Sequence, residues 1–159
     1  MSAAPEPVAV TRFKEAHSAA GGGGRVVILP DSVHTAVLAA QALGCEVGAI
    51  ANSLVFDADG RPVLILTSGA HRVDTVATAA RIGVPALQRA SAEFVRAHTG
   101  NVIGGVSPLG HPGPVPTWLD VELRRYDEIW AAAGHPAAVF STTYDELLAM
   151  TGATEIEVD

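Results

Sequence analysis

A polar pair, Asn52 and Ser53, interrupts an apolar and β-branched segment, Ile50 to Phe56, that reads IANSLVF. Asparagine offers one hydrogen-bond acceptor and two donors without a charge, and serine offers a hydroxyl. Such groups can orient a water molecule or bind a substrate amine, but they cannot form an ion pair with a phosphate or a carboxylate. The pair is therefore a candidate site. The alternative is a turn that caps the short helical piece before it.

A second candidate is the segment 100–116, GNVIGGVSPLGHPGPVP, which has five glycines and four prolines in seventeen positions. Regular structure is not expected there, so many backbone N–H groups lack strand partners. Gly104 and Gly105 let a ligand approach the backbone, and Pro108 stiffens the loop. Donors arranged in this way stabilise the negative charge that develops on a carbonyl oxygen during ester hydrolysis. The alternative is an ordinary tight connection between two strands.

Histidines form a third set of candidates. His71 and His111 lie close to these segments in the sequence, and a near-neutral pKa suits a general base, although a plain surface position is the alternative for both. No G-x-S-x-G elbow offers a nucleophile. The lone Cys45 has no partner for a disulfide, and no His, Asp or Glu cluster has the spacing of a zinc site. We therefore expect no metal and no cofactor.

Composition limits the class of protein. The chain has 159 residues, 48% of them hydrophobic, and carries a net charge of −7, which fits one globular domain over residues 1–159. The acidic balance argues against DNA or RNA held by bulk electrostatics. No apolar run is long enough for a membrane span and no signal peptide is evident, so we expect a cytoplasmic protein. Residues 71–119 alone are net cationic, which makes them the expected place for an anionic ligand, unless their arginines simply cover solvated helix faces.

Periodicity and capping patterns predict alternating helices and strands. Helices are expected at 8–20, at 34–43 with Ser32 as its N-cap, at 46–50 in short form, at 73–82, from Ser91 to about 100, and at 143–150. Strands are expected at 25–30, in a hairpin of 53–57 and 62–67, and at 117–119, 129–133, 138–141 and 155–158. This order predicts an α+β fold, with a mixed, mostly antiparallel sheet or partly closed barrel surrounded by helices.

Five segments follow one another along the chain: the helix from Thr35 to Gly44, then VGAIANSLVF, HRVD, VIGGVSPLG and VPTWLD. Their order resembles the YbaK/ProX family, the free-standing relatives of the prolyl-tRNA synthetase editing domain. The resemblance covers residues 8–152, and its most specific part is a Gly-x-x-x-Pro loop from Gly104 to Pro108. It implies hydrolysis, in trans, of the ester between a wrong amino acid and the 3′ end of a tRNA. It also implies mischarged tRNA as the partner and at most weak association with a synthetase.

The resemblance also implies roles for individual residues. Asn52 stands where the family has a lysine central to activity, and the only lysine of this chain is Lys14. With Asn52, the resemblance makes Gly104 and Gly105 the catalytic residues. The implied substrate-binding residues are His34, Ser53, His71, Ser107, Pro108, Leu109 and Gly110. For His34, an exposed position at a helix start is the equal alternative. Asp120 is expected to order a strand and loop by hydrogen bonding.

Two functions remain open from the sequence. The first is an aminoacyl-tRNA deacylase that works with Asn52 in the lysine position. The second is a catalytically depleted module of the same fold that binds an aminoacyl-tRNA end, an amino acid or a protein partner without hydrolysis. An unrelated small-molecule hydrolase is a third and weaker reading. The family pattern favours the first, whereas the missing lysine and the acidic charge favour the second.

Overall fold

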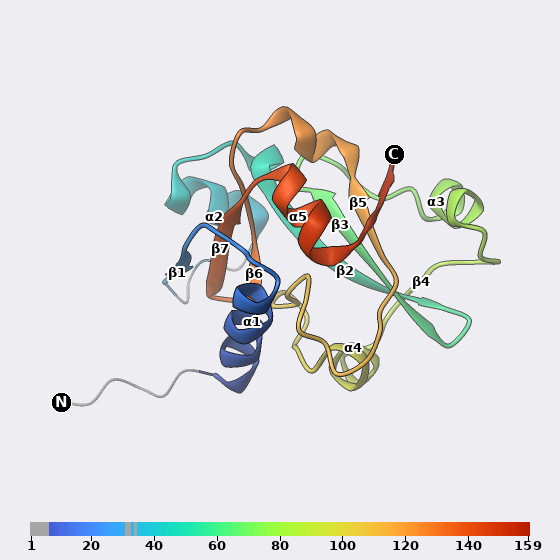
Figure 1. The fold of residues 1–159 in the computed structure, drawn as a ribbon. Coiled ribbons are helices and arrows are strands. Elements are labelled where there is room, and N and C mark those ends of the chain that lie inside the picture. The colour runs from blue at the N-terminus through green and yellow to red at the C-terminus, as the bar shows by residue number, and fades with distance from the viewer. Residues whose placement is uncertain (1–6, 31–32, 34) are drawn as a thin grey trace.

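The computed structural model describes residues 7–30, 33 and 35–159, and within these residues eight strands form one mixed sheet (Figure 1). The strands are β1 (Val26–Ile28), β2 (Ile50–Ala58), β3 (Arg61–Ser68), β4 (Gln88–Arg89), β5 (Thr117–Asp120), β6 (Ile129–His135), β7 (Ala138–Thr142) and β8 (Thr154–Ile156). Their spatial order is β1-β7-β6-β2-β3-β5-β8, and β4 pairs with β2 outside this path. The α+β fold expected from the sequence is confirmed.

Helices surround this sheet. They are α1 (Val8–Ala19), α2 (Ala36–Leu43), α3 (Thr75–Ile82), α4 (Ala92–Thr99) and α5 (Tyr144–Thr151), with short 3-10 helices η1 (Val47–Ala49) and η2 (Val121–Arg125). The first turns of α2 to α5 are each capped by a side-chain oxygen that accepts a backbone N–H, from Thr35, Asp74, Ser91 and Thr143. The expected cap Ser32 lies outside the described residues, and the prediction is wrong because Thr35, directly before α2, supplies the acceptor.

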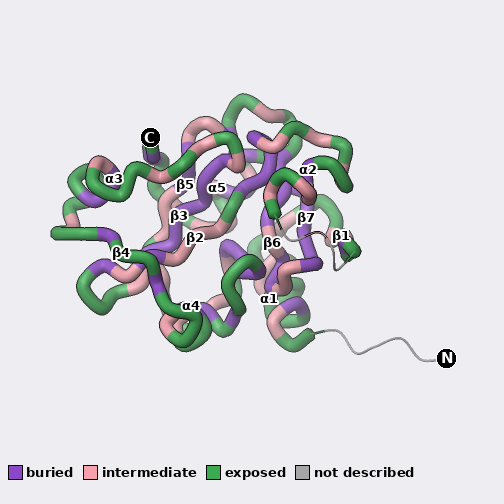
Figure 2. Tube along the Cα trace, turned by 180° about the vertical axis from the view of Figure 1, so that it is seen from behind, coloured by how far each residue is buried: buried purple, intermediate pink, exposed green. Residues whose placement is uncertain are grey.

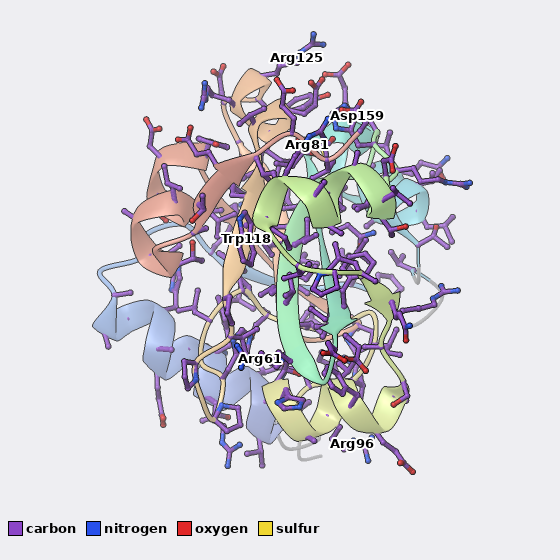
Figure 3. The ribbon with its side chains drawn as sticks, turned by 90° about the vertical axis from the view of Figure 1, so that its right-hand side faces the viewer. Arg61, Arg81, Arg96, Trp118, Arg125 and Asp159 are labelled. Carbon is purple, nitrogen blue, oxygen red and sulfur yellow. The ribbon has the colours of Figure 1, made fainter. Side chains whose placement is uncertain are left out.

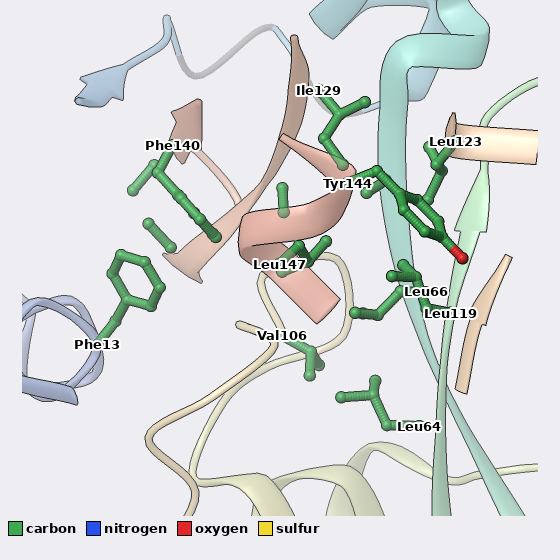
Figure 4. Close-up of a cluster of buried hydrophobic side chains, with 14 of the residues drawn as sticks. Phe13, Leu64, Leu66, Val106, Leu119, Leu123, Ile129, Phe140, Tyr144 and Leu147 are labelled. Carbon is green, nitrogen blue, oxygen red and sulfur yellow. The ribbon is translucent and has the colours of Figure 1, made fainter. Parts of the chain in front are cut away.

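The main core lies where α1 and α5 pack on the sheet (Figure 4). Phe13 of α1 and Phe140 of β7 are fully buried, with ring centroids 4.5 Å apart. Leu147 of α5 joins them, and Leu64 and Leu66 extend the cluster along β3. Each such side chain contributes roughly 1.5–3 kcal/mol when fully buried. Figure 2 shows the same pattern along the chain, with most of β3, β6 and β7 buried and the outer helix faces exposed.

Strand β2 is paired unevenly on its two edges. One edge pairs with β3 from Ala51 to Ala58. The other edge runs parallel to β6 only at Ile50 and Ala51, and antiparallel to β4 only at Phe56 and Asp57. Residues 52–55 therefore have a partner strand on one side only, and the β2–β3 hairpin extends away from the β6–β7 pair (Figure 1). The sheet is split at the position of the polar pair.

Boundaries differ from the expected ones in two informative places. Strand β2 begins at Ile50, directly after η1, so Asn52 and Ser53 lie inside the strand and do not form a capping turn. Pairing with β3 explains this, because Asn52 is in register with Thr67. The two-residue strand β4 and the 3-10 helix η2 were not predicted, since both are too short to show periodicity.

Candidate functional site

Two adjacent cavities meet at the polar pair of β2. The larger has a volume of about 570 Å³ and is walled mainly by apolar side chains of α2, β6 and β7, Trp130 among them. The smaller, of about 280 Å³, lies along β2 and is bordered by Arg89 of β4 and by Val95 of α4. The residues that line both cavities are Asn52, Ser53, Ile103 and Gly104. The structure therefore brings together two segments that are about fifty residues apart in the sequence.

The side chains of Asn52 and Ser53 have no hydrogen-bond partner among the described residues. The Asn52 side chain is exposed and makes no hydrogen bond there. The Ser53 hydroxyl oxygen is buried and also has no hydrogen-bond partner. A buried hydroxyl without a partner costs free energy, on the order of 1–3 kcal/mol, so a bound group or water that satisfies it is favoured. Both residues are thus available to a ligand in the cavities.

Gly104 and Gly105 of the loop have different surroundings. Gly104 is exposed, has a φ of +87° that strongly favours glycine, and lines both cavities. Gly105 is buried, and its N–H already donates to the carbonyl of Val102 at 2.9 Å. A Cβ on Gly105 would lie 2.6 Å from the backbone nitrogen of Pro136 in the β6–β7 turn. Gly104 can therefore face a ligand, whereas Gly105 lets the loop pack against the sheet.

The rest of the Gly-x-x-x-Pro loop turns away from Asn52. Ser107 is buried, and its hydroxyl lies 2.7 Å from the Leu109 carbonyl. Pro108, Leu109 and Gly110 line a separate hollow of about 440 Å³ that also includes His111. None of these four residues lines either of the two cavities at the polar pair. The structure therefore places them away from the two cavities at Asn52.

His71 lies on the far side of β3, in a network around Asp120. The Asp120 carboxylate is fully buried, and its Oδ2 accepts from His71 Nδ1 at 2.9 Å, from the Ser68 N–H at 3.0 Å and from the Thr67 hydroxyl at 3.2 Å. His71 Nε2 lies 3.4 Å from a carboxylate oxygen of Asp159. His71 lines neither of the two cavities. Asp120 has the ordering role expected of it.

His111 is also removed from the polar pair. Its Nε2 donates to the Ser107 carbonyl at 2.7 Å. Burial lowers the pKa of the His111 imidazole below its ordinary value, and the hydrogen bond to Ser107 opposes this only in part. His111 therefore serves as a neutral donor that holds the loop. His34 lies outside the described residues, so its predicted substrate contact remains a prediction.

The described lining of the two cavities is nearly free of charge. Arg89 is its only ionisable side chain, at one end of the smaller cavity. In the described part of the chain, no group of three or more His, Cys, Asp or Glu side chains is placed to hold a metal ion. Within the same residues, no helix is both long and apolar enough to cross a bilayer. The cavities thus offer amide, hydroxyl and backbone groups among apolar walls.

Sequence reasoning missed three residues of this site. Ile103 is 59% exposed beside Gly104, and an isoleucine in a glycine-rich loop was the available signal. Trp130 of β6 lines the larger cavity, but the sequence pattern around it indicated only a buried strand. Asn101 is buried and accepts two hydrogen bonds from Ser107, which nothing in the local sequence indicates.

The fold and the site define a known class of protein. A solved structure of a candidate trans-editing enzyme for prolyl tRNA synthetase superimposes with a TM-score of 0.90 and is 43% identical, covering 98% of this chain and 99% of that one. The model of the aminoacyl-tRNA editing domain matches residues 30–150. The chain therefore belongs to the aminoacyl-tRNA editing domain family, of the YbaK/ProX type, and this confirms the resemblance seen in the sequence.

Two curated relatives are similar over most of the chain. The uncharacterized protein YwhH of Bacillus subtilis (strain 168) is 32% identical over 110 residues, which is 69% of this chain and 69% of YwhH. EbsC of Enterococcus faecalis, a candidate Cys-tRNA(Pro)/Cys-tRNA(Cys) deacylase, is 28% identical over 120 residues, or 75% of this chain and 73% of EbsC. The family is one of ester hydrolases that act on aminoacyl-tRNA.

Proposed function

We propose that this chain is a trans-editing aminoacyl-tRNA deacylase that works with Asn52 in the position of the family lysine. The observation that carries the proposal is the meeting of Asn52 and Gly104 at the boundary of two cavities. The ester joins an amino acid to a nucleoside, so a site that holds it needs two adjoining cavities, one for each part. The editing unit is the whole chain, residues 1–159, and its partner is the 3′ end of a mischarged tRNA.

The volumes suggest how the ester is held. The larger cavity, about 570 Å³, is the one with room for the terminal nucleoside, and its Trp130 offers an aromatic surface for a base. The smaller cavity, about 280 Å³, suits an amino-acid side chain. The ester carbonyl then lies at the boundary, between Asn52 and Gly104. Selectivity among amino acids would follow from the volume of the smaller cavity, where one methylene is worth about 1–3 kcal/mol.

Neutral donors perform the chemistry in this proposal. The Gly104 N–H makes no hydrogen bond among the described residues, and the Asn52 amide is exposed beside it. Both can donate to the carbonyl oxygen as negative charge develops during attack by water. The described lining holds no carboxylate or imidazole, so the proton of the attacking water passes to solvent or to the substrate itself.

The same lack of a base favours a second candidate function, a binding module that holds the aminoacyl end without hydrolysis. The two candidates predict the same cavity occupancy and differ in turnover. A deacylation assay with a panel of aminoacyl-tRNAs, alanyl-tRNA(Pro) and cysteinyl-tRNA(Pro) included, separates them. Turnover that is lost in Gly104→Ala supports the deacylase. Saturable binding of the same tRNAs with no turnover by the wild type supports the binding module.

A further inference from the structure

The split in the sheet leaves a short stretch of β2 backbone unpaired, and we propose that this edge, at Ser53 and Val55, binds the α-ammonium and carbonyl groups of an aminoacyl ligand. The inference rests on the proposed function, because it names the part of the site that holds the amino acid. It assigns recognition of the ammonium and the carbonyl to main-chain groups of β2.

The direction of the backbone groups follows from the β2–β3 ladder. In an antiparallel pair, residues that exchange hydrogen bonds alternate with residues that do not. The Gly69 N–H donates to the Ile50 carbonyl at 2.8 Å, so the even-numbered residues of β2 face β3. The odd-numbered residues face the other edge. There Ala51 pairs with β6 and Asp57 with β4, while Ser53 and Val55 have no partner strand.

These unpaired groups lie in the smaller cavity, which both Ser53 and Val55 line. Two N–H groups and two carbonyl groups point to one edge without a partner strand in the described structure. Ser53 and Val55 are only partly buried, so water or a ligand in the cavity can satisfy these backbone groups. The buried Ser53 hydroxyl, also without a partner, adds a third polar group in the same place.

The length of the edge limits what it can bind. The unpaired stretch, residues 52–55, spans about 13 Å at 3.3 Å per residue, and β6 and β4 close its two ends. An inserted strand of another protein would need a longer open edge. One amino-acid residue fits, with its ammonium donating to a carbonyl and its own carbonyl accepting an N–H.

Charge sets the orientation. The described lining contains no carboxylate for the ammonium, so backbone carbonyls and the side-chain oxygens of Asn52 and Ser53 are its acceptors there. Arg89 is in register with Phe56 at one end of the edge, where it repels a second cation. The ammonium is therefore placed at the Ser53 carbonyl, beside Asn52, and the ester carbonyl accepts the Val55 N–H, which leaves its second lone pair for the Gly104 N–H. Every amino acid shares these groups, which leaves discrimination to the side-chain pocket.

Amide hydrogen exchange measured by NMR tests the inference in the intact protein. The probe is 3′-deoxy-3′-(alanylamino)adenosine, in which a stable amide replaces the ester, and adenosine alone is the control. Free protein should exchange the Ser53 and Val55 amides fast and the Leu54 amide slowly. Saturating probe should slow the Val55 amide by about 10-fold or more, as expected when its N–H donates to the carbonyl of the probe, and leave Leu54 unchanged.

Two variations sharpen the result. A lactoyl analogue, with a hydroxyl in place of the ammonium, should bind about 10-fold more weakly. Val55→Pro removes one outward N–H without touching the β3 ladder, and should fold yet bind the probe about 10-fold more weakly. If Val55→Pro fails to fold, amide hydrogen exchange in the wild-type protein still tests the inference.

Three results would overturn the inference. They are probe binding without protection of the Val55 amide, no probe binding at all, and protection by an extended tetrapeptide but not by the probe. The proposed function fails separately, if the protein binds the probe and protects the Val55 amide but deacylates no aminoacyl-tRNA.

Discussion

Asn101 and Ser107 are joined twice across the base of the glycine loop. The Ser107 N–H donates to Asn101 Oδ1 at 3.0 Å, and the Ser107 hydroxyl lies 3.2 Å from the same oxygen. Both residues are buried. Between them the chain turns so that Gly104 reaches the two cavities. This pair of contacts between Asn101 and Ser107 therefore sets the position of Gly104, the loop residue whose N–H faces the proposed ester.

Replacing Asn101 by alanine should loosen the loop. The Ser107 N–H would be left buried without a partner, which costs about 1–3 kcal/mol of the free energy of unfolding. We expect kcat/KM for deacylation to fall more than stability alone explains, because Gly104 loses its fixed position. Asn101→Asp keeps the accepting oxygen and should retain most of both properties. Equal losses in the two variants would contradict this role of the contacts between Asn101 and Ser107.

Gly105→Ala should be costly although Gly105 faces no cavity. Its Cβ would lie 2.6 Å from the Pro136 nitrogen, which forces the loop or the β6–β7 turn to move. We expect a loss of about 1–3 kcal/mol, the usual cost of overpacking, measured by denaturant unfolding. Gly113→Ala is the matched control, since a Cβ there meets nothing within 4 Å. A neutral result for Gly105→Ala would show that this contact can relax freely.

Removal of the Asp120 carboxylate should destabilise the fold without disabling the cavities. Asp120→Ala leaves the Ser68 N–H and the Thr67 hydroxyl without their acceptor, at about 2–5 kcal/mol in total. Asp120→Asn keeps one acceptor oxygen and should lose less. Turnover per folded molecule should be unchanged in Asp120→Asn, because Asp120 lines neither cavity. A selective loss of kcat with normal stability would instead place this network in catalysis.

His111 should make stability depend on pH in the weakly acidic range. Because burial lowers the pKa of folded His111, the unfolded chain takes up a proton near pH 6.5 while the folded chain does not. The unfolded state then binds more protons, so the free energy of unfolding falls as pH drops below about 6.5. The fall stops once pH is below the folded pKa. His111→Gln should show a smaller fall over this range, and an unchanged pH profile would contradict this account.

Figure 3 shows a further tie that the sequence did not predict, between Arg81 of α3 and the C-terminal residue Asp159. Arg81 Nη1 donates to the backbone carbonyls of Glu157 and Asp159 at 2.6 and 3.1 Å. From the sequence, Arg81 is only one of the arginines in the net cationic segment 71–119, the expected place for an anionic ligand. Here it anchors the chain end. Composition shows where charge is concentrated, but only the fold shows which atoms each charge reaches.

The elements with strong local signals were predictable from the sequence. Helix α4 begins after Ser91 because a serine side chain accepts the Phe94 N–H, and the Asp-Ala-Asp-Gly turn specified the β2–β3 hairpin. The meeting of Asn52 with Gly104 was expected only from the family resemblance. Spacing alone could not supply it, because it depends on how β6 and β4 leave β2 unpaired.

The sequence could not predict which other loop residues line the cavities, for a physical reason. The loop tip reverses direction after Gly104, so neighbours in sequence such as Pro108 and Leu109 face a different hollow. The same reversal buries Gly105 against Pro136. A contiguous motif therefore need not form a contiguous surface, and backbone dihedral angles decide which of its residues reach a ligand.

The most direct test of the central claim is deacylation of alanyl-tRNA(Pro) and cysteinyl-tRNA(Pro) by the wild type, Asn52→Ala and Gly104→Ala, with each variant checked for folding. The account predicts turnover by the wild type. It also predicts that each substitution lowers kcat/KM by about 10-fold or more, as expected when a donor to the developing oxyanion is lost or displaced. A wild type that binds these tRNAs without turnover, or an Asn52→Ala variant as active as the wild type, would contradict the account.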